Sequence, residues 1–177
     1  MLFRDSNDGD LVAITEIYAH YVCHTTASFE TEPPDAAEMA VRRARILGAR
    51  LPWLVAEIDG AVAGYAYAAP YRTRAAYRFT LEDSIYLHPA HAGKGIGAFL
   101  LARLIERCER WGARQLVAVI GGNENAASIR LHEKLGFRRA GLLHAAGFKF
   151  GRWADSVLMQ RALGLGDTTV PEEPAIS

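Results

Sequence analysis

The chain has 177 residues, half of them hydrophobic and 23% charged, a composition typical of one globular domain with a sizeable core. Its 20 Lys and Arg residues balance 20 Asp and Glu residues, and this zero net charge argues against nucleic-acid binding through bulk positive charge. The sequence has no membrane-spanning apolar run, no signal-like N-terminus and only two cysteines, so we expect a cytoplasmic protein that neither enters membranes nor depends on disulfides.

The first half of the chain predicts a strand, two helices and a hairpin. Aspartates precede both helical patterns, where their side chains can cap a helix, and Asp59-Gly60 is a strong two-residue hairpin signal. In order, we expect a strand at 2–4, a helix from Asp8 or Asp10 to about Val22, a loop at 25–34, a helix from Asp35 to about Leu47 that Gly48 stops, and strands at 53–58 and 62–69.

The second half predicts a strand-helix-strand-helix unit and two last strands. In order, we expect a strand at 79–87, a long helix from Ile96, a strand at 116–120 buried on both faces, a helix capped by Asn125 and closed by Gly136, and strands at 137–148 and 153–163. The order β-α-α-β-β-β-α-β-α-β-β is that of an α/β protein, but not of a doubly wound fold. We therefore predict one domain at 1–163 and a loose tail at 164–177.

The segment Ala92-Gly93-Lys94-Gly95-Ile96-Gly97 joins the 79–87 strand to the long helix. Glycines let a backbone approach a ligand closely, and the first amides of a helix have no partner within the helix. Such amides bind anions, and most simply a pyrophosphate. The segment therefore predicts a phosphate site.

Two nucleotide-binding motifs fit this segment poorly. A P-loop requires Ser or Thr after the lysine, but Gly95 follows Lys94. A dinucleotide fingerprint requires a tight turn directly after the strand, but the strand ends near Leu87, and the next strand ends in Gly121-Gly122 without the expected acidic residue. On its own, the segment could also be a simple connecting turn.

Two motifs in sequence resemble the GCN5-related N-acetyltransferases (GNAT family), which use acetyl-CoA. Pro89-x-x-x-Gly93-x-Gly95-x-Gly97 resembles the family's pyrophosphate loop, although Ala92 stands where Gln or Arg is usual. The segment from Asn125 to Phe137 resembles the family's later motif, with His132 in the position of a common Tyr. The resemblance implies the GNAT fold, a mixed and mostly antiparallel sheet of about seven strands flanked by about four helices.

Further segments resemble one group of that family, the phosphinothricin and methionine sulfoximine N-acetyltransferases. They are Ser28-Phe29-Glu30-Thr31-Glu32-Pro33, Pro52-Trp53-Leu54-Val55-Ala56-Glu57, Val117-Ala118-Val119-Ile120-Gly121 and Ala145-Ala146-Gly147-Phe148-Lys149. The resemblance implies a detoxifying homodimer that acetylates the α-amine of phosphinothricin, methionine sulfoximine or methionine sulfone. We expect no metal, because no histidine has metal-ligand spacing.

The resemblance also implies roles for individual residues. Glu82 is the expected base, acting directly or through water, and His132 the expected acid for the thiolate or a helper to the base. Phe29, Arg72, Arg74 and Tyr77 are the expected substrate-binding residues. Expected contacts to acetyl-CoA come from Ile85, Tyr86, Leu87, Gly93, Lys94, Gly95, Ile96, Gly97, Ala98 and Asn125.

Alternatives remain open for the residues and for the function. Glu82 could be a solvated strand-end carboxylate, His132 a helix-surface histidine, and the arginine segment a solvated basic loop. A GNAT enzyme could instead acetylate a peptide or protein N-terminal amine or another amine. A non-catalytic acyl-CoA-binding module is a third possibility, which Ala92 alone favours.

Overall fold

Seven strands form one sheet in the computed structural model, which describes residues 1–122 and 125–171. The strand order is β1-β2-β3-β4-β5-β7-β6, and every neighbouring pair is antiparallel except β4 and β5. The strands are β1 (Leu2–Asp5), β2 (Trp53–Ile58), β3 (Ala61–Pro70), β4 (Thr80–Leu87), β5 (Gln115–Gly121), β6 (Arg138–Lys149) and β7 (Arg152–Ala162). The predicted element order is confirmed.

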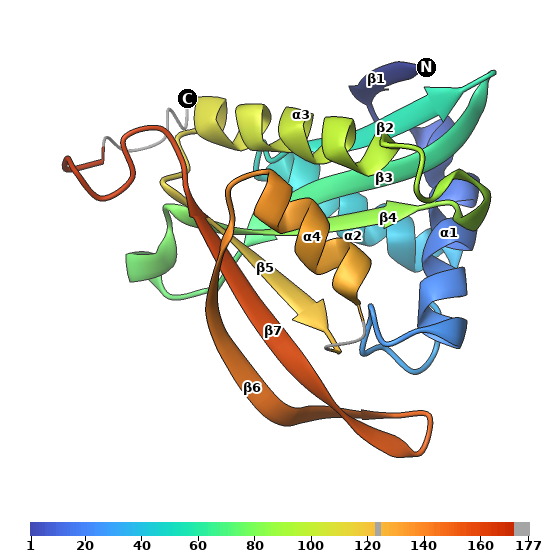
Figure 1. The fold of residues 1–177 in the computed structure, drawn as a ribbon. Helices are drawn as coiled ribbons and strands as arrows, with labels where there is room; N and C mark the ends of the chain where they lie inside the picture. The colour runs from blue at the N-terminus through green and yellow to red at the C-terminus, as the bar shows by residue number, and fades with distance from the viewer. Residues whose placement is uncertain (123–124, 172–177) are drawn as a thin grey trace.

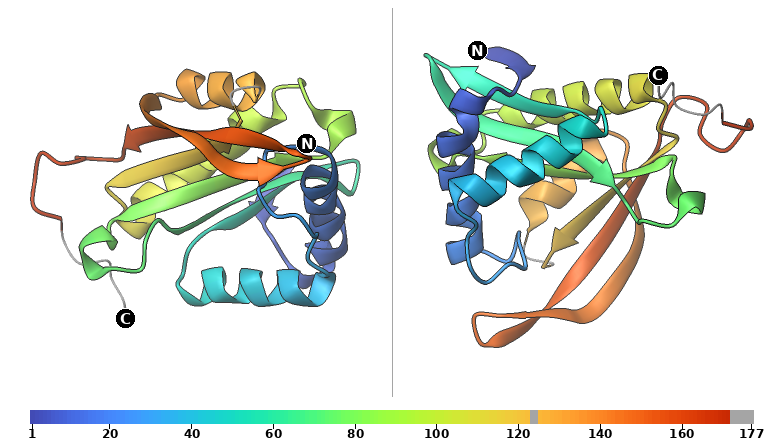
Figure 2. Two further views of the ribbon diagram at one scale, coloured as in Figure 1. Left: turned by 90° about the horizontal axis from the view of Figure 1, so that it is seen from below. Right: turned by 180° about the vertical axis from the view of Figure 1, so that it is seen from behind.

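Four helices cover the sheet in two pairs, α1 with α2 on one face and α3 with α4 on the other (Figures 1 and 2). They are α1 (Leu11–His24), α2 (Ala36–Gly48), α3 (Ile96–Trp111) and α4 (Ala126–Lys134). The apolar stripe of α3 that was expected from the sequence, including Leu100 and Leu104, is fully buried against the sheet. Within the described ranges, no helix is long and apolar enough to cross a membrane.

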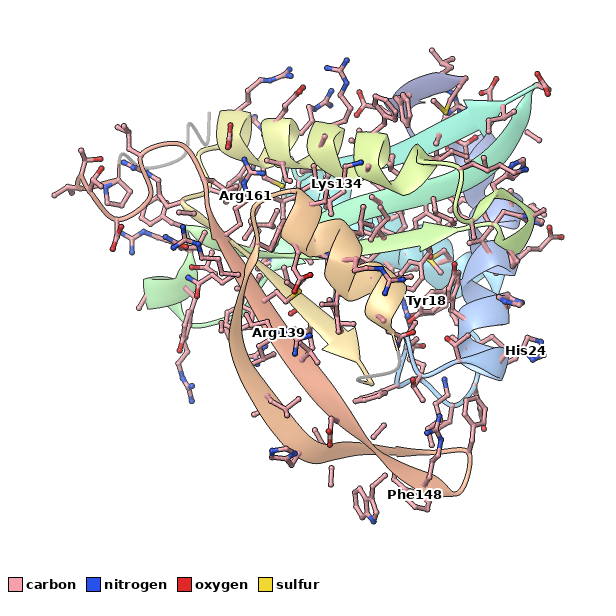
Figure 3. All side chains as sticks on the ribbon, in the orientation of Figure 1. Tyr18, His24, Lys134, Arg139, Phe148 and Arg161 are labelled. Atoms are coloured by element: carbon pink, nitrogen blue, oxygen red, sulfur yellow. The ribbon has the colours of Figure 1, made fainter. Side chains whose placement is uncertain are left out.

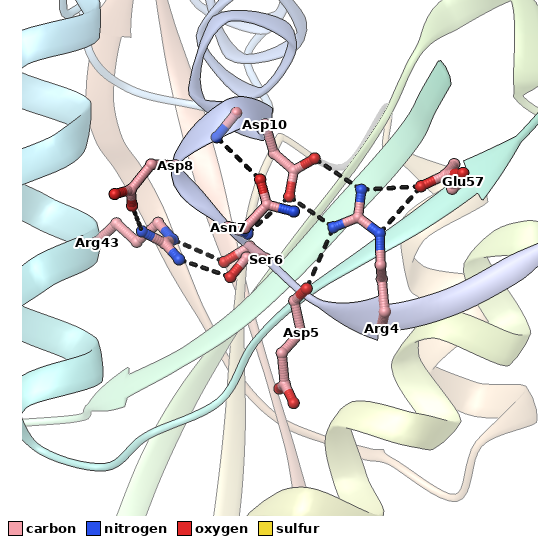
Figure 4. Close-up of polar contacts among 9 residues, drawn as sticks. Arg4, Asp5, Ser6, Asn7, Asp8, Asp10, Arg43 and Glu57 are labelled. Atoms are coloured by element: carbon pink, nitrogen blue, oxygen red, sulfur yellow. Dashed lines mark hydrogen bonds and ion pairs between the residues drawn. The ribbon is translucent and has the colours of Figure 1, made fainter. Parts of the chain in front are cut away.

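Three local predictions need correction or refinement. Asp35 caps α2 as expected. Before α1, the side chain of Asn7 caps the short turn that leads into the helix. The carboxylate of Asp10 instead accepts two hydrogen bonds from the guanidinium of Arg4, at 2.7 and 2.8 Å (Figure 4). Asn125 stands at the start of α4 without a side-chain cap, and its amide donates to the carbonyl of Gly121. Strand β5 is not buried throughout, since Val119 is 38% exposed.

The β6–β7 hairpin extends beyond the helices (Figure 1). Exposed apolar residues on or beside it are Leu142, Leu143, Phe148, Phe150 and Trp153. After β7, Arg114 donates to the Gly166 carbonyl and the Thr169 hydroxyl, while positions 172–177 of the predicted tail lie outside the described residues. The hairpin is the largest departure from the compact body of the sheet and helices.

The two central strands separate from each other partway along their length. Parallel pairing runs from Thr80 opposite Gln115 to Asp83 opposite Ala118 and then stops, although β4 continues to Leu87 and β5 to Gly121. We call this opening between β4 and β5 the fork. It leaves one edge of β4 without a strand partner in the middle of the sheet, which is where an extended ligand can pair with the backbone.

Candidate active site

At the fork, the register of β4 decides which amides are open. His88 donates its backbone N–H to the carbonyl of Ala63, the residue directly opposite it, so these two residues form a hydrogen-bonded pair. Hydrogen-bonded pairs alternate with non-hydrogen-bonded pairs along antiparallel strands. Gly64 and Leu87 are therefore a non-hydrogen-bonded pair, and Tyr65 and Tyr86 exchange both backbone hydrogen bonds. The Tyr86 amide is therefore paired within the sheet, and the expected contact of Tyr86 with acetyl-CoA stays a prediction. The amides of Ile85 and Leu87 point the other way, into the fork.

The glycine segment brings a second set of backbone amides to the same end of β4. Gly93 and Gly95 have φ of 75° and 81°, a conformation that other residues adopt at a cost, and no side chain caps the start of α3 at Ile96. A Cβ on Gly97 would lie 3.4 Å from the Leu87 side chain, so the start of this 16-residue helix packs on the end of β4. Together with the exposed Lys94, this end of α3 is suited to bind a pyrophosphate.

Glu82 lies on the opposite side of β4 from this helix, on the face that α1 and α2 cover. Its register partners are Ala69 on β3 and Val117 on β5. Burial raises the pKa of Glu82 above its usual value, the charge of Asp83 adds to the rise, and the charge of Arg72 opposes it. A carboxylate with a raised pKa is a better proton acceptor.

A cavity of about 340 Å³ opens beside Glu82 on this face. Ala69, the cross-strand partner of Glu82, is part of its wall. The remaining wall residues are Tyr18, Glu38, Met39, Val41, Arg42, Arg45, Ile46, Trp53, Tyr65 and Tyr67. Trp53 and Tyr67 stack with ring centroids 4.3 Å apart, which gives the cavity a flat aromatic floor beneath charged residues of α2. We call it the acceptor-side cavity.

His132 lies on the other face, in a buried pair with Asp83. Its Nε2 is 3.0 Å from the Asp83 carboxylate and its Nδ1 is 2.8 Å from the Ser128 carbonyl, so both ring nitrogens are engaged. Burial alone would lower the pKa of His132, but the hydrogen bond and charge of Asp83 outweigh it and the pKa is raised. The structure does not bring His132 and Glu82 together, and His132 is only 2% exposed.

The expected substrate-binding residues come from two loops. Arg72, Arg74 and Tyr77 are exposed in the segment between β3 and β4, where Arg72 lies over the Tyr71 ring and its charge acts on Glu82. Phe29 comes from the loop between α1 and α2. Its ring occupies the space that side chains at Gly121 and Gly147 would fill, at the end of β5 where the fork is widest.

Sequence reasoning missed three residues around the fork. Tyr21 on α1 donates its hydroxyl to the Leu87 carbonyl at 2.8 Å, and Lys149 on β6 donates to the loop that carries Phe29. Gly121 admits the backbone of that loop, because any Cβ there would collide with the Thr26 carbonyl. The only signal in the sequence was a glycine inside an apolar strand, which often marks close backbone approach.

Figure 3 shows Tyr18 on α1 and Phe148 near the tip of the β6–β7 hairpin. Across residues 1–122 and 125–171, no three His, Cys, Asp or Glu side chains gather as a metal site would require. The described groups around the fork and the cavity are carboxylates, arginines, backbone amides and the buried His132.

Comparison with known proteins gives a consistent result. A sequence model described as the Acetyltransferase (GNAT) family matches residues 14–137. Phosphinothricin N-acetyltransferase from Alcaligenes faecalis is 59% identical over 96% of this chain and 86% of its own length. L-methionine sulfoximine/L-methionine sulfone acetyltransferase from Salmonella typhimurium is 45% identical over 92% of this chain and 95% of its own.

A solved structure has nearly the same fold. The phosphinothricin acetyltransferase of Sinorhizobium meliloti, in complex with acetyl-CoA, superposes with a TM-score of 0.94 at 51% identity, covering 97% of this chain and 93% of that one. The fork, the glycine segment and the two helix pairs therefore belong to an architecture that accommodates acetyl-CoA in a close relative.

Proposed function

This chain belongs to the GNAT family of acetyltransferases, and from that premise we propose that it transfers the acetyl group of acetyl-CoA to the α-amine of a small amino acid. Phosphinothricin, methionine sulfoximine and methionine sulfone are the acceptors that the names of its relatives indicate. The glycine segment and the amides of Ile85 and Leu87 are the proposed acetyl-CoA site, with Asn125 beside it. The Leu87 amide donates to the Tyr21 hydroxyl at 3.4 Å, a long contact that a ligand would replace.

One observation supports this function above the others: the two half-sites lie on opposite faces of β4 and share the fork. The start of α3 packs on the end of β4 from one face, and on the other face the acceptor-side cavity reaches Ala69, the cross-strand partner of Glu82. A donor and an acceptor that enter from different faces can meet in the gap between the strands. Holding two reactants in this way lowers the entropic part of the barrier to group transfer.

Glu82 supplies the base that the chemistry requires. The α-amine of an amino acid or peptide is largely protonated at neutral pH, with a pKa of about 7.7–8.0 in peptides, and only the neutral amine is a nucleophile. In our proposal the amine gives its proton to Glu82, directly or through water, and attacks the thioester carbon. The amide of Ile85, the nearer of the two to Glu82 along β4, donates to the carbonyl oxygen as it gains negative charge, and the amide of Leu87 lies beside the pantetheine arm. The C–S bond then breaks and the thiolate takes up a proton.

We propose His132 as the acid that gives its proton to that thiolate. Both of its ring nitrogens are engaged, so one hydrogen bond, to Asp83 or to Ser128, must open before the ring can donate elsewhere. The geometry favours a second role in which the pair holds α4 against β4 where the fork begins. The pH experiment in the Discussion separates this structural contribution from a catalytic one.

Acceptor recognition is assigned to the two loops. Arg72 and Arg74 would bind the acceptor's carboxylate, since a guanidinium matches a carboxylate with two parallel hydrogen bonds. Tyr77 and Phe29 would enclose the acceptor. An acceptor side chain ending in a sulfone, sulfoximine or phosphinate would then extend toward the acceptor-side cavity, where an aromatic floor lies beneath Arg42 and Arg45.

We propose further that two copies form a homodimer in the cytoplasm, and that detoxification is the physiological role. The exposed apolar residues of the β6–β7 hairpin support the dimer, because a surface of this kind commonly marks an interface. The zero net charge supports a small-molecule substrate in preference to nucleic acid.

Steady-state rates with a panel of acceptors test the function. Thiol release from acetyl-CoA would be measured with phosphinothricin, L-methionine sulfoximine, L-methionine sulfone and a short peptide that has a free N-terminal amine. We expect saturable turnover with at least one amino acid, an N-acetyl product by mass spectrometry, and much slower turnover of the peptide. Faster acetylation of the peptide, or no turnover of any amino acid, would contradict the proposal.

A further inference from the structure

Lys149, at the end of β6, is a buried lysine that the reaction described above does not use. Its side chain is 4% exposed, and Nζ donates to the Thr25 carbonyl at 2.9 Å and the Ser28 carbonyl at 2.6 Å. None of the described carboxylates forms an ion pair with it. Burial lowers the pKa of Lys149 below its usual value, although the nearby charge of Glu30 opposes this.

The two carbonyls that Lys149 binds bracket the start of the loop that carries Phe29. Ser28 also meets the hydroxyl of Tyr18 at 2.9 Å, and the same hydroxyl donates to Glu30 at 2.7 Å. Tyr18 is in turn part of the acceptor-side cavity wall. The loop is therefore fixed on both sides of Phe29, by Lys149 from the sheet and by Tyr18 from α1.

The position of this loop matters because of where Phe29 lies. Its ring packs on Gly121, which follows Val117 by four residues along β5 and so shares the face of Val117 and Glu82. Phe29 consequently covers the acceptor side of the fork. A shift of the loop would uncover that side without touching the glycine segment at the start of α3.

A buried ammonium without an ion-pair partner is costly, and its cost is offset here by two backbone carbonyls and by the Phe150 ring, whose centroid lies 5.0 Å from Nζ. A methionine could fill the same space, but it would leave the carbonyls of Thr25 and Ser28 without that donor. Such a loop would gain alternative conformations. This is the arrangement expected of a side chain that fixes a loop rather than one that adds stability to a core.

We propose that Lys149 is a positioning residue for the acceptor: it holds the Thr25–Glu30 loop so that Phe29 closes the acceptor side of the fork. The expected effect of Lys149 on acceptor binding rests on the proposed function. The hold of Lys149 on the Thr25–Glu30 loop rests on the contacts alone. Lys149 touches neither reactant. It acts through the two carbonyls and Phe29.

The kinetic test compares Lys149→Met with Lys149→Arg and with Lys134→Met, a control at an exposed lysine on α4. For Lys149→Met we expect the acceptor KM to rise about tenfold or more, with little change in kcat or in the acetyl-CoA KM. Lys149→Arg should restore part of the acceptor affinity, since a guanidinium can still donate to carbonyls. Combination with Phe29→Ala should be non-additive, because both changes open the same cover.

A second measurement keeps the inference testable if Lys149→Met folds poorly or if amino acids are not the acceptors. Amide hydrogen exchange of the ligand-free protein would be compared between wild type and Lys149→Arg, which retains the charge. We expect faster exchange at residues 25–30 and unchanged exchange in α3. Unchanged exchange at residues 25–30 in Lys149→Arg, or an equal rise in the acceptor KM and the acetyl-CoA KM of Lys149→Met, would overturn the proposal.

Discussion

At the residue scale, Glu82 and Asp83 show how neighbouring carboxylates take up different roles. Alternation along β4 turns Glu82 toward α1 and α2 and Asp83 toward α4, where it meets His132 at 3.0 Å. Burial raises the pKa of Glu82, which makes its carboxylate a better proton acceptor. Asp83 is 6% exposed and committed to His132.

Replacement of Glu82 tests the base. We expect Glu82→Gln to lower kcat by about 10²–10⁴-fold, because the amide cannot accept the amine's proton. In the wild type the rate should fall as the pH drops through the raised pKa of Glu82, and this acid limb should be absent from the variant's pH–rate profile. Glu133→Gln, at an exposed residue of α4, is the control. An unchanged rate and profile would exclude Glu82 as the base.

The Asp83–His132 pair predicts a pH-dependent stability. The pKa of His132 is raised in the folded state, so the pair's full contribution is present below the unfolded value of about 6.5 and is lost as the pH rises through the folded pKa. The free energy of unfolding, measured with denaturant, should fall as the pH rises from about 6.5 through the folded pKa of His132. His132→Gln should remove that trend and lower stability by about 3–5 kcal/mol, whereas the control His24→Gln should keep it.

If His132 were also the thiolate acid, the variant would lose kcat beyond any effect of unfolding. Rates measured on the fully folded variant therefore separate the two roles. A His132→Gln enzyme with the same slope of stability against pH as wild type would contradict the structural role.

Arg74 tests the assignment of the acceptor carboxylate. It stands in the exposed segment before the turn at Ala75–Tyr77, and charge-assisted hydrogen bonds of this kind contribute about 1.5–3 kcal/mol. Arg74→Ala should therefore raise the acceptor KM by about tenfold or more and leave the acetyl-CoA KM unchanged. Arg103→Ala on α3 is the control, and an untouched acceptor KM in Arg74→Ala would refute the assignment.

At the scale of elements, the fork and the start of α3 form one donor site because β4 connects them. Parallel pairing that stops at Asp83 opposite Ala118 leaves the Ile85 and Leu87 amides without a strand partner, and the glycine segment turns the chain into α3 at the same end of β4. Neither element alone specifies acetyl-CoA. Their combination places a backbone edge and a helix N-terminus within one extended site.

Gly95 tests the second part of that site. Its φ of 81° costs a residue with a side chain about 1–2 kcal/mol. We expect Gly95→Ala to shift the loop, to raise the acetyl-CoA KM several-fold and to leave the acceptor KM unchanged. Gly48→Ala provides a matched control, since Gly48 ends α2 with open space around its Cβ position. Equal acetyl-CoA KM values for wild type and Gly95→Ala would argue against pyrophosphate binding there.

Local patterns predicted the elements well and long-range contacts poorly. The apolar stripe of α3, the cap at Asp35 and the Asp59-Gly60 turn depend on neighbours in sequence, and all are present. Asp10 and Asn125 were wrongly expected to cap helices, because their side chains bind Arg4 and the Gly121 carbonyl.

The site divided in the same way between predictable and unpredictable parts. Motifs in the sequence located the glycine segment before the long helix. The fork, the loss of the Tyr86 amide to Tyr65 and the role of Lys149 follow from strand register and from a contact spanning 121 residues. No pattern of neighbouring residues encodes these features.

At the scale of the whole molecule, our proposal places the two reactants on opposite faces of the sheet, and the β6–β7 hairpin extends beyond the helices (Figure 1). Helices α3 and α4 enclose the donor face, and α1 and α2 enclose the acceptor face (Figure 2). The hairpin carries Trp153 at 65% exposure and Phe148 at 58%. Apolar surface of this kind is best explained by a second copy of the chain.

A charge on the hairpin tests the dimer. We expect wild type to sediment as a dimer and Trp153→Glu to sediment as a monomer at the same concentration, because an unpaired carboxylate in an apolar interface is costly. Val12→Glu places the same charge on an exposed apolar residue of α1 and should leave the dimer intact. A monomeric wild type, or a dimeric Trp153→Glu variant, would contradict the proposed interface.

The most direct test of the central claim, that donor and acceptor meet across β4 at Glu82, is a crystal structure of the protein with coenzyme A and methionine sulfone bound together. We predict that the thiol enters the fork beside the amides of Ile85 and Leu87, and that the amine lies within about 2.6–3.2 Å of Glu82 or one water molecule away. A thiol bound outside the fork, or an amine on the face of His132, would contradict the account.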